Sequence, residues 1–352
     1  MPQTDFDLLH QAARLAKRGH GCAEPNPMVG CVITNKNGVI VGNGFHEQYG
    51  QAHAEINALK SAGSESCGGT AYVTLEPCNH QGKTPPCSQT LLEAGITRVV
   101  IGAKDPHPAA GGGAAFLRQE GIDVVILDDA QCEELVAPFV HRINTGLPWV
   151  TCKWAQTIDG CIETSEHESP WISSMESQHR VHQERGCVDA IVVGVGTVIA
   201  DNPSLTVRHA TKRRTPIRVV IDPTLRTPEN ATILNDDAIT LLAHAEHADT
   251  SRLPSCLKFS LPSVNGVLEI KPLFQHLVSE FDAANIIVEG GGTVFQHIFD
   301  QMLANELWIF TSPHSSSMKP KVNMNDLVQQ FQTKCMGHEM CGVDSVERLR
   351  II

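Results

Sequence analysis

The chain has 352 residues, 39 of them acidic and 27 basic, so its formal net charge is −12. A chain of this length usually exceeds what one hydrophobic core organises, which predicts two domains. The acidic balance gives no electrostatic footprint for nucleic acid, and no apolar run reaches the roughly 18 residues of a membrane span, so we expect neither partner.

The first 146 residues alternate helix and strand signals in the order of an α/β/α layered domain. The N-terminal segment spaces apolar side chains at helical intervals among charges, so we expect an amphipathic helix and no signal peptide. The predicted elements are, in chain order, a helix within 1–21, a hairpin of strands 28–34 and 38–44, a helix over 54–63, a strand over 71–75, a helix over 88–95, a strand over 98–103, a helix over 113–121, a strand over 122–127 and a helix over 131–144. We expect the domains to span 1–146 and 147–352.

Four side chains in two segments carry the clearest chemical signal, and they are His53, Glu55, Cys78 and Cys87. One imidazole and two thiolates hold zinc with its fourth position open, and a water bound there has its pKa lowered to about 7. Glu55 and His53 can face one site only at the first turn of a helix, and helical composition begins at Ala54. Glu55 need not bind metal, so it can carry protons between that water and a departing amine. The pattern predicts a hydrolytic deaminase with one zinc ion per chain.

The flanking residues place both thiols at element ends. Pro77 ends a β-rich run immediately before Cys78, and Cys87 opens a helix-like segment, whose N-terminus favours a thiolate. The alternative is a purely structural zinc ion, and such a site would require a fourth protein ligand. His80 is the nearest candidate for that ligand, and we interpret it as a substrate contact.

The second half alternates apolar β-branched runs with helical stretches, which predicts a mainly parallel sheet covered by helices. The predicted strands are 149–155, 188–194, 216–222, 238–244, 285–291 and 306–312, and the predicted helices are 179–186, 272–283 and 293–304.

Two of these strands end in glycines that lead into helices, namely Gly194 with Gly196, and the run from Gly290 to Gly292. Glycine at a strand end lets a phosphate approach the backbone, and a helix N-terminus supplies amides and a favourable dipole. Neither set completes GxGxxG, because Ile199 stands where the last glycine would fall. Plain turn chemistry is the alternative, and the local motifs leave both possibilities open.

Several segments share a common family pattern. In the first half they are PNPMVGCVI (25–33), HAEINAL (53–59), TLEPCNHQGKTPPC (74–87) and KDPHP (104–108), and in the second KWAQTIDG (153–160), SPWISS (169–174), VGVGTVIADNPSLTVR (193–208), PIRVVID (216–222) and NIIVEGGGTV (285–294). Together they resemble the bifunctional deaminase–reductases of riboflavin biosynthesis, and the long gap between the two zinc cysteines distinguishes that family from most other zinc deaminases. The resemblance covers nearly the whole chain. It implies a cytidine-deaminase-like α/β/α domain followed by a dihydrofolate-reductase-like α/β domain.

The resemblance also implies the residues of two sites. In the first domain, His53, Cys78 and Cys87 would hold Zn²⁺, Glu55 would be catalytic, and Asn26, His80 and Lys83 would contact the substrate. In the second, the substrate site would comprise Lys153, Ser173, Arg185, Asp201, Leu205, Arg208 and Glu289, with NADPH on Gly194, Gly196, Thr197, Gly290, Gly291, Gly292 and Thr293. A guanidinium such as that of Arg208 presents a planar fork that suits a phosphate.

The implied activity is deamination of 2,5-diamino-6-ribosylamino-4(3H)-pyrimidinone 5′-phosphate, followed by NADPH-dependent reduction of its ribosyl chain to ribityl. The resemblance further implies a homo-oligomer, a dimer or a tetramer. Twelve scattered cysteines, two of them assigned to the metal, favour a reducing compartment, so we expect a cytoplasmic protein.

Three positions depart from the family pattern, all in the second half: Trp154, Cys161 and the segment 311–323. The main alternative is therefore a deaminase whose C-terminal domain is degenerate and only binds ligand or builds an oligomer. A second alternative is a zinc-stapled, nucleotide-binding regulator without catalysis. A third, nucleic-acid editing, is disfavoured by the acidic charge.

Overall fold

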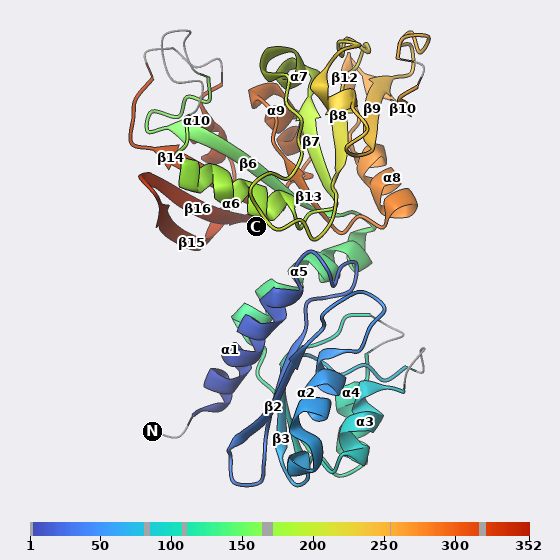
Figure 1. Cartoon of the computed structure of the whole chain (residues 1–352), viewed down its shortest axis with the longest axis vertical. Coiled ribbons are helices and arrows are strands. Elements are labelled where there is room, and N and C mark those ends of the chain that lie inside the picture. The colour runs from blue at the N-terminus through green and yellow to red at the C-terminus, as the bar shows by residue number, and fades with distance from the viewer. Residues whose placement is uncertain (1–2, 81–84, 108–110, 164–171, 254, 317–321) are drawn as a thin grey trace. The chain divides into compact units, whose positions relative to one another are not determined.

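The computed structural model describes residues 3–80, 85–107, 111–163, 172–253, 255–316 and 322–352. The chain folds into two compact units, Met1–Gly146 and Leu147–Ile352, each with its own sheet (Figure 1). Each unit also has its own hydrophobic cores.

The first unit is built on a five-stranded sheet in the order β2-β1-β3-β4-β5. The strands are β1 (Gly30–Thr34), β2 (Ile40–Phe45), β3 (Thr70–Leu75), β4 (Arg98–Ala103) and β5 (Asp123–Ile126). The hairpin partner β2 and strand β3 run antiparallel to β1, whereas β3, β4 and β5 are parallel to one another.

Helices cover both faces of this sheet. They are α1 (Asp5–Ala16), α2 (Ala54–Ala62), α3 (Cys87–Glu93), α4 (Gly113–Gln119) and α5 (Ala130–Thr145). Side chains of α2, α3 and α4 share one core with the strands, and α1 and α5 share another. An added Cβ at Gly44 would lie 2.5 Å from the Ala58 nitrogen, so the close approach of α2 to β2 requires glycine. The predicted α/β/α layer order is confirmed.

The second unit holds a nine-stranded sheet in the order β10-β9-β8-β7-β13-β6-β14-β16-β15. Its strands are β6 (Trp149–Thr157), β7 (Ala190–Gly194), β8 (Ile217–Ile221), β9 (Thr240–Ala245), β10 (Leu257–Leu261), β13 (Asn285–Val288), β14 (Glu306–Ser312), β15 (Thr333–Cys341) and β16 (Asp344–Ile351). A separate small hairpin joins β11 (Ser263–Val264) to β12 (Val267–Leu268). In this spatial order, every pair of neighbours from β10 to β14 is parallel, and β16 and β15 extend the sheet with antiparallel strands. The prediction of a mainly parallel sheet is confirmed.

The helices of the second unit lie on both faces of its sheet. They are α6 (Met175–Arg185), α7 (Val195–Asp201), α8 (Lys271–Phe281), α9 (Gly292–Asp300) and α10 (Met324–Val328). Ile286 and Val288 of β13 pack in one core with α8 and α9, whereas Ile287 packs in the other with α6 and α7. Alternate side chains of one central strand thus enter opposite cores, as expected for a sheet covered on both sides. Among the described helices of either unit, none combines the length and apolar character needed to cross a bilayer.

Strand β10 and the C-terminal hairpin of β15 and β16 were not predicted from the sequence. Strand β15 is an edge strand, and most of its side chains are exposed on both faces. Alternation of apolar and polar residues arises only when one face is buried, so β15 carries no such pattern.

Candidate active sites

The three predicted zinc ligands converge in the first unit. His53 is the N-cap of α2, Cys78 follows β3, and Cys87 is the first residue of α3. The Nδ1 atom of His53 lies 3.6 Å from Cys78 Sγ and 3.3 Å from Cys87 Sγ. The three donor atoms lie within 4.8 Å of one another, and they form the one such group found among the described residues.

The chemistry of these donors suits a zinc ion with an open position. The backbone amide of Cys87 donates to Cys78 Sγ at 3.4 Å. Hydrogen bonding from the Cys87 thiol, together with His53, lowers the pKa of Cys78 well below its usual range against the opposing effect of burial. One sulfur is therefore predisposed to be a thiolate, the form that binds metal. No described side chain completes the group as a fourth ligand, so the geometry fits a catalytic zinc better than a structural one.

Glu55 lies in the first turn of α2, two residues after His53, and only 3% of its surface is exposed. Burial raises its pKa, although the nearby His53 charge opposes that effect. A raised pKa makes a carboxylate a stronger base, which suits a group that must accept and return a proton.

Asn26 also reaches this site, through a residue that the sequence analysis did not single out. Its amide nitrogen lies 3.3 Å from Nε2 of the buried His46, whose ring packs edge-on against His53 with centroids 5.4 Å apart. Nδ1 of His46 donates to the Ala52 carbonyl at 3.1 Å, and burial lowers its pKa, so Nε2 is free to accept from Asn26. His46 stands in no motif that would have marked it.

The other two predicted substrate contacts of this unit are less defined. His80 is exposed and lies two residues beyond Cys78. Lys83 lies outside the described residues.

In the second unit, Glu289 is the centre of a buried charge cluster, directly after the carboxyl end of β13 and beside the middle of β6. Arg185 at the end of α6 donates two hydrogen bonds to it, Nε to Oε1 at 2.8 Å and Nη2 to Oε2 at 2.7 Å. Lys153 Nζ lies 3.9 Å from the same Oε2, and the three side chains are between 8% and 15% exposed. Burial raises the pKa of Glu289, but the Arg185 charge and hydrogen bonds, with Lys153, outweigh it and hold that pKa at about 2.

Of the remaining predicted substrate residues, Arg208 and Leu205 lie in the loop after α7, whereas Asp201 and Ser173 lie next to helix ends. Arg208 is exposed, and its backbone amide donates to Nδ1 of His182 at 3.2 Å, which links it to α6. Leu205 is buried in the core beneath the same loop, with a φ of 49°. Asp201 at the end of α7 and Ser173 before α6 make no described side-chain contact with the Glu289 cluster. His182 was not predicted, since a histidine within a helix carries no local signal.

The glycines predicted to hold the cofactor end two neighbouring parallel strands, β7 and β13. An added Cβ at Gly194 or Gly290 would lie within 2.7 Å of the Val294 side chain, whereas Cβ atoms at Gly196 and Gly291 would meet nothing within 4 Å. Gly291 is the N-cap of α9, and no side chain caps that helix. The exposed Thr293 follows in its first turn, and Thr197 is half-buried in α7. Open backbone beside an uncapped helix N-terminus suits the phosphates of a dinucleotide.

Two of the departures from the family pattern, Trp154 and the altered segment, contact α9. Trp154 is buried in the core against Phe295, with ring centroids 5.3 Å apart, and Cys161 is buried as well. Within the altered segment, Val322 packs against Gly292, where an added Cβ would lie 2.9 Å from the valine Cβ. The part of the segment that the structure describes therefore still closes on the glycine loop.

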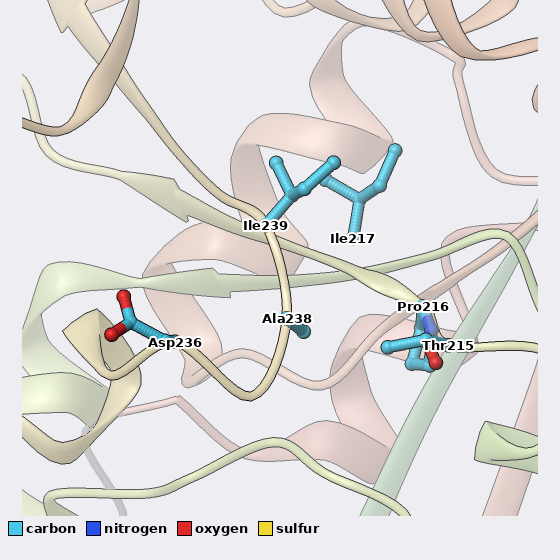
Figure 2. A pocket seen from close by; sticks show the side chains of 6 residues that line it. All are labelled: Thr215, Pro216, Ile217, Asp236, Ala238 and Ile239. Atoms are coloured by element: carbon cyan, nitrogen blue, oxygen red, sulfur yellow. The ribbon is translucent and has the colours of Figure 1, made fainter.

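A surface pocket of about 370 Å³ lies elsewhere on this unit (Figure 2). It is lined by Thr215, Pro216, Ile217, Asp236, Ala238 and Ile239. These residues precede or begin β8 and β9, at the amino ends of the strands. Ligands of open parallel sheets bind at the carboxyl ends, so this pocket is not the candidate site.

Comparison with known proteins identifies both units. A family model for the cytidine and deoxycytidylate deaminase zinc-binding region matches residues 2–103, and a model for the RibD C-terminal domain matches residues 148–344. The riboflavin biosynthesis protein RibD of Actinobacillus pleuropneumoniae is 40% identical and aligns with 88% of this chain and 84% of its own. RibD of Escherichia coli strain K12 is 37% identical, with 88% of each chain covered.

Solved structures agree. The diaminohydroxyphosphoribosylaminopyrimidine deaminase/5-amino-6-(5-phosphoribosylamino)uracil reductase of Thermotoga maritima is 32% identical, covers 99% of each chain and superposes with a TM-score of 0.84. RibD of Acinetobacter baumannii, form 1, is 31% identical with the same coverage and a TM-score of 0.82. The resemblance drawn from the sequence is thereby confirmed. The chain belongs to the RibD family, and it is a bifunctional enzyme of riboflavin biosynthesis with a zinc-binding deaminase domain and an NADPH-dependent reductase domain.

Proposed function

We propose that the first unit removes an amino group from the pyrimidine of 2,5-diamino-6-ribosylamino-4(3H)-pyrimidinone 5′-phosphate and that the second reduces the ribosyl chain of the product. The observation that carries this proposal is the convergence of His53 Nδ1 and two cysteine sulfurs beside a buried Glu55. The name of the Thermotoga maritima neighbour, a deaminase and reductase of phosphoribosylated pyrimidines, supports the choice of substrate.

In the proposed deamination, His53, Cys78 and Cys87 hold the zinc ion, which when bound would activate water for attack on the ring carbon that bears the amino group. Glu55 takes a proton from the water and passes it to the departing amine, so that ammonia leaves. Its burial supports this role, because a raised pKa makes the carboxylate a stronger base toward the water. Asn26, oriented by His46, would hydrogen-bond the pyrimidine and hold it over Glu55.

In the proposed reduction, bound NADPH would supply a hydride to C1 of the sugar, while the bond between C1 and the ring oxygen breaks and that oxygen takes up a proton. The chain positions the two reactants. Glu289, kept ionised by Arg185 and Lys153, would accept hydrogen bonds from sugar hydroxyls, and Arg208 would clamp the phosphate. The loops at Gly194 to Thr197 and Gly290 to Thr293 would carry the cofactor.

Two assays test both steps on the purified protein. The diaminopyrimidine substrate should release ammonia, and its deaminated product should support NADPH oxidation. Ammonia release without NADPH oxidation would favour a degenerate second unit that only binds ligand or builds an oligomer. Tight ligand binding without either reaction would favour a regulator and contradict the proposal.

We further propose that the protein works in the cytoplasm as a homo-oligomer on a small-molecule substrate. All twelve cysteines are free thiols, which supports a reducing compartment. The net charge of −12 supports a small metabolite over a nucleic acid. Light scattering on the purified protein tests the assembly, and a monomer at micromolar concentration would contradict that part of the proposal.

A further inference from the structure

One face of α6 joins two elements of the proposed reductase substrate site. His182 and Arg185 lie three positions apart on this helix, so they share a side of it. Arg185 binds Glu289 beyond the end of β13. Nδ1 of His182 accepts the backbone N–H of Arg208 at 3.2 Å, in the loop that follows α7.

The loop that carries Arg208 does not adopt its shape through intrinsic backbone preference. Leu205 and His209 have φ angles of 49° and 55°, in the left-handed region that residues with a Cβ disfavour. Its first part is anchored by Asn202, whose Oδ1 accepts from the Thr232 amide at 2.7 Å, and by the buried Leu205. At the Arg208 end, the described anchor is His182.

An imidazole nitrogen can accept this hydrogen bond only when it carries no proton. Burial, together with the charges of Arg185 and Arg208, lowers the pKa of His182 to about 4. The other groups that act on the ring are Glu289, which opposes this effect, and His209, which adds to it. His182 is therefore neutral at physiological pH, with its proton on Nε2.

We propose that His182 is a positioning residue of the reductase site, whose Nδ1 fixes the Arg208 backbone and thereby sets where the Arg208 guanidinium meets the phosphate of a sugar phosphate monoester. The inference rests on the proposed reduction of a ribosyl phosphate. The two arginines and the histidine therefore act together. The charges of Arg185 and Arg208 help to keep the His182 ring neutral, and the neutral ring holds the Arg208 backbone in place.

Two substitutions separate the nitrogens of the ring. In His182→Asn the amide oxygen can take the place of Nδ1, whereas the longer side chain of His182→Gln carries its amide to the place of Nε2. With the deaminated ribosyl phosphate and NADPH as substrates, H182Q should raise KM for the ribosyl phosphate about tenfold and change kcat less than about threefold. H182N should stay within about threefold of the wild-type KM.

Inorganic phosphate provides a second measurement. As a competitive inhibitor of the reduction, it should bind H182Q more weakly by the same factor as the substrate does, whereas a general loss of structure would lower kcat. His179→Asn is the matched control, because His179 is exposed on the same helix and should alter neither parameter. The deamination rate of each variant should equal that of the wild type, which checks that the first unit is intact.

A double substitution decides whether His182 acts through Arg208. Arg208→Ala should raise KM, and H182Q/R208A should be no worse than R208A alone. Additive effects, or an H182N as impaired as H182Q, would overturn the inference while leaving the proposed function intact. An R208A variant with unchanged KM would overturn both the inference and the proposed role of Arg208 as the phosphate clamp.

Discussion

The ion pair between Arg185 and Glu289 gives a quantitative test of the electrostatics of the second unit. Replacement of Arg185 by methionine removes both hydrogen bonds to Glu289, whose side chain is 8% exposed, and leaves Lys153 Nζ 3.9 Å away. A buried carboxylate that loses its partner retains the cost of desolvation, so the second unit should be markedly less stable.

Two lines of reasoning give the size of the effect. Breaking a buried pair from one side costs about 3–5 kcal/mol. The difference between an ordinary pKa of 4.5 and the value of about 2 for Glu289 corresponds to about 3 kcal/mol, because each pKa unit is worth about 1.4 kcal/mol. Lys153 supplies part of this stabilisation and remains in R185M, so we expect a loss of about 3 kcal/mol, at the lower end of the range for buried pairs. At about 2–4 °C per kcal/mol for a unit of this size, Tm should fall by about 6–12 °C.

Tryptophan fluorescence measures this transition selectively. All four tryptophans of the chain lie beyond residue 146, so the first unit contributes no tryptophan signal. The control is R185M combined with Glu289→Gln. The second substitution removes the negative charge of Glu289 that R185M leaves without its arginine, so it should recover most of the lost stability. A fall of less than about 2 °C in R185M, or no recovery in the double variant, would refute the reasoning.

The same pair makes a pH prediction with a definite sign. The pKa of folded Glu289 lies below its ordinary value, so its contribution to stability is fully present above pH 4.5 and is lost as the pH falls through about 2. Wild-type Tm should therefore drop in that window. R185M should show a weaker dependence there, because it lacks the cation that depresses the pKa.

Three further outcomes follow. Glu55→Gln should lower ammonia release by at least about 10²-fold with one zinc per chain and NADPH oxidation unchanged, and loss of zinc by elemental analysis would instead mark Glu55 as structural. Removal of zinc by a chelator should abolish deamination and lower the stability of the first unit, whereas reduction of the deaminated substrate should continue; loss of both activities would contradict independent sites. Because an added Cβ at Gly291 meets nothing within 4 Å, Gly291→Ala should keep the wild-type Tm yet weaken NADPH binding about tenfold in a fluorescence titration, and an unchanged affinity would place the cofactor elsewhere.

The sequence by itself determined the layered α/β architecture of both units and located the candidate zinc ligands. Both kinds of information are local. His53 and Cys87 stand at helix starts, and Cys78 follows a strand, so short motifs located all three.

The tertiary structure alone decided which distant side chains meet. Arg185 and Glu289 are 104 residues apart, and their pairing depends on where the end of α6 lies relative to β13. His46 and His182 act through contacts with Asn26 and the Arg208 backbone, which leave no periodic or motif signal in the chain. A hydrogen bond between remote residues follows from the path of the backbone between them, whereas hydrophobic periodicity reports only the faces of a single element.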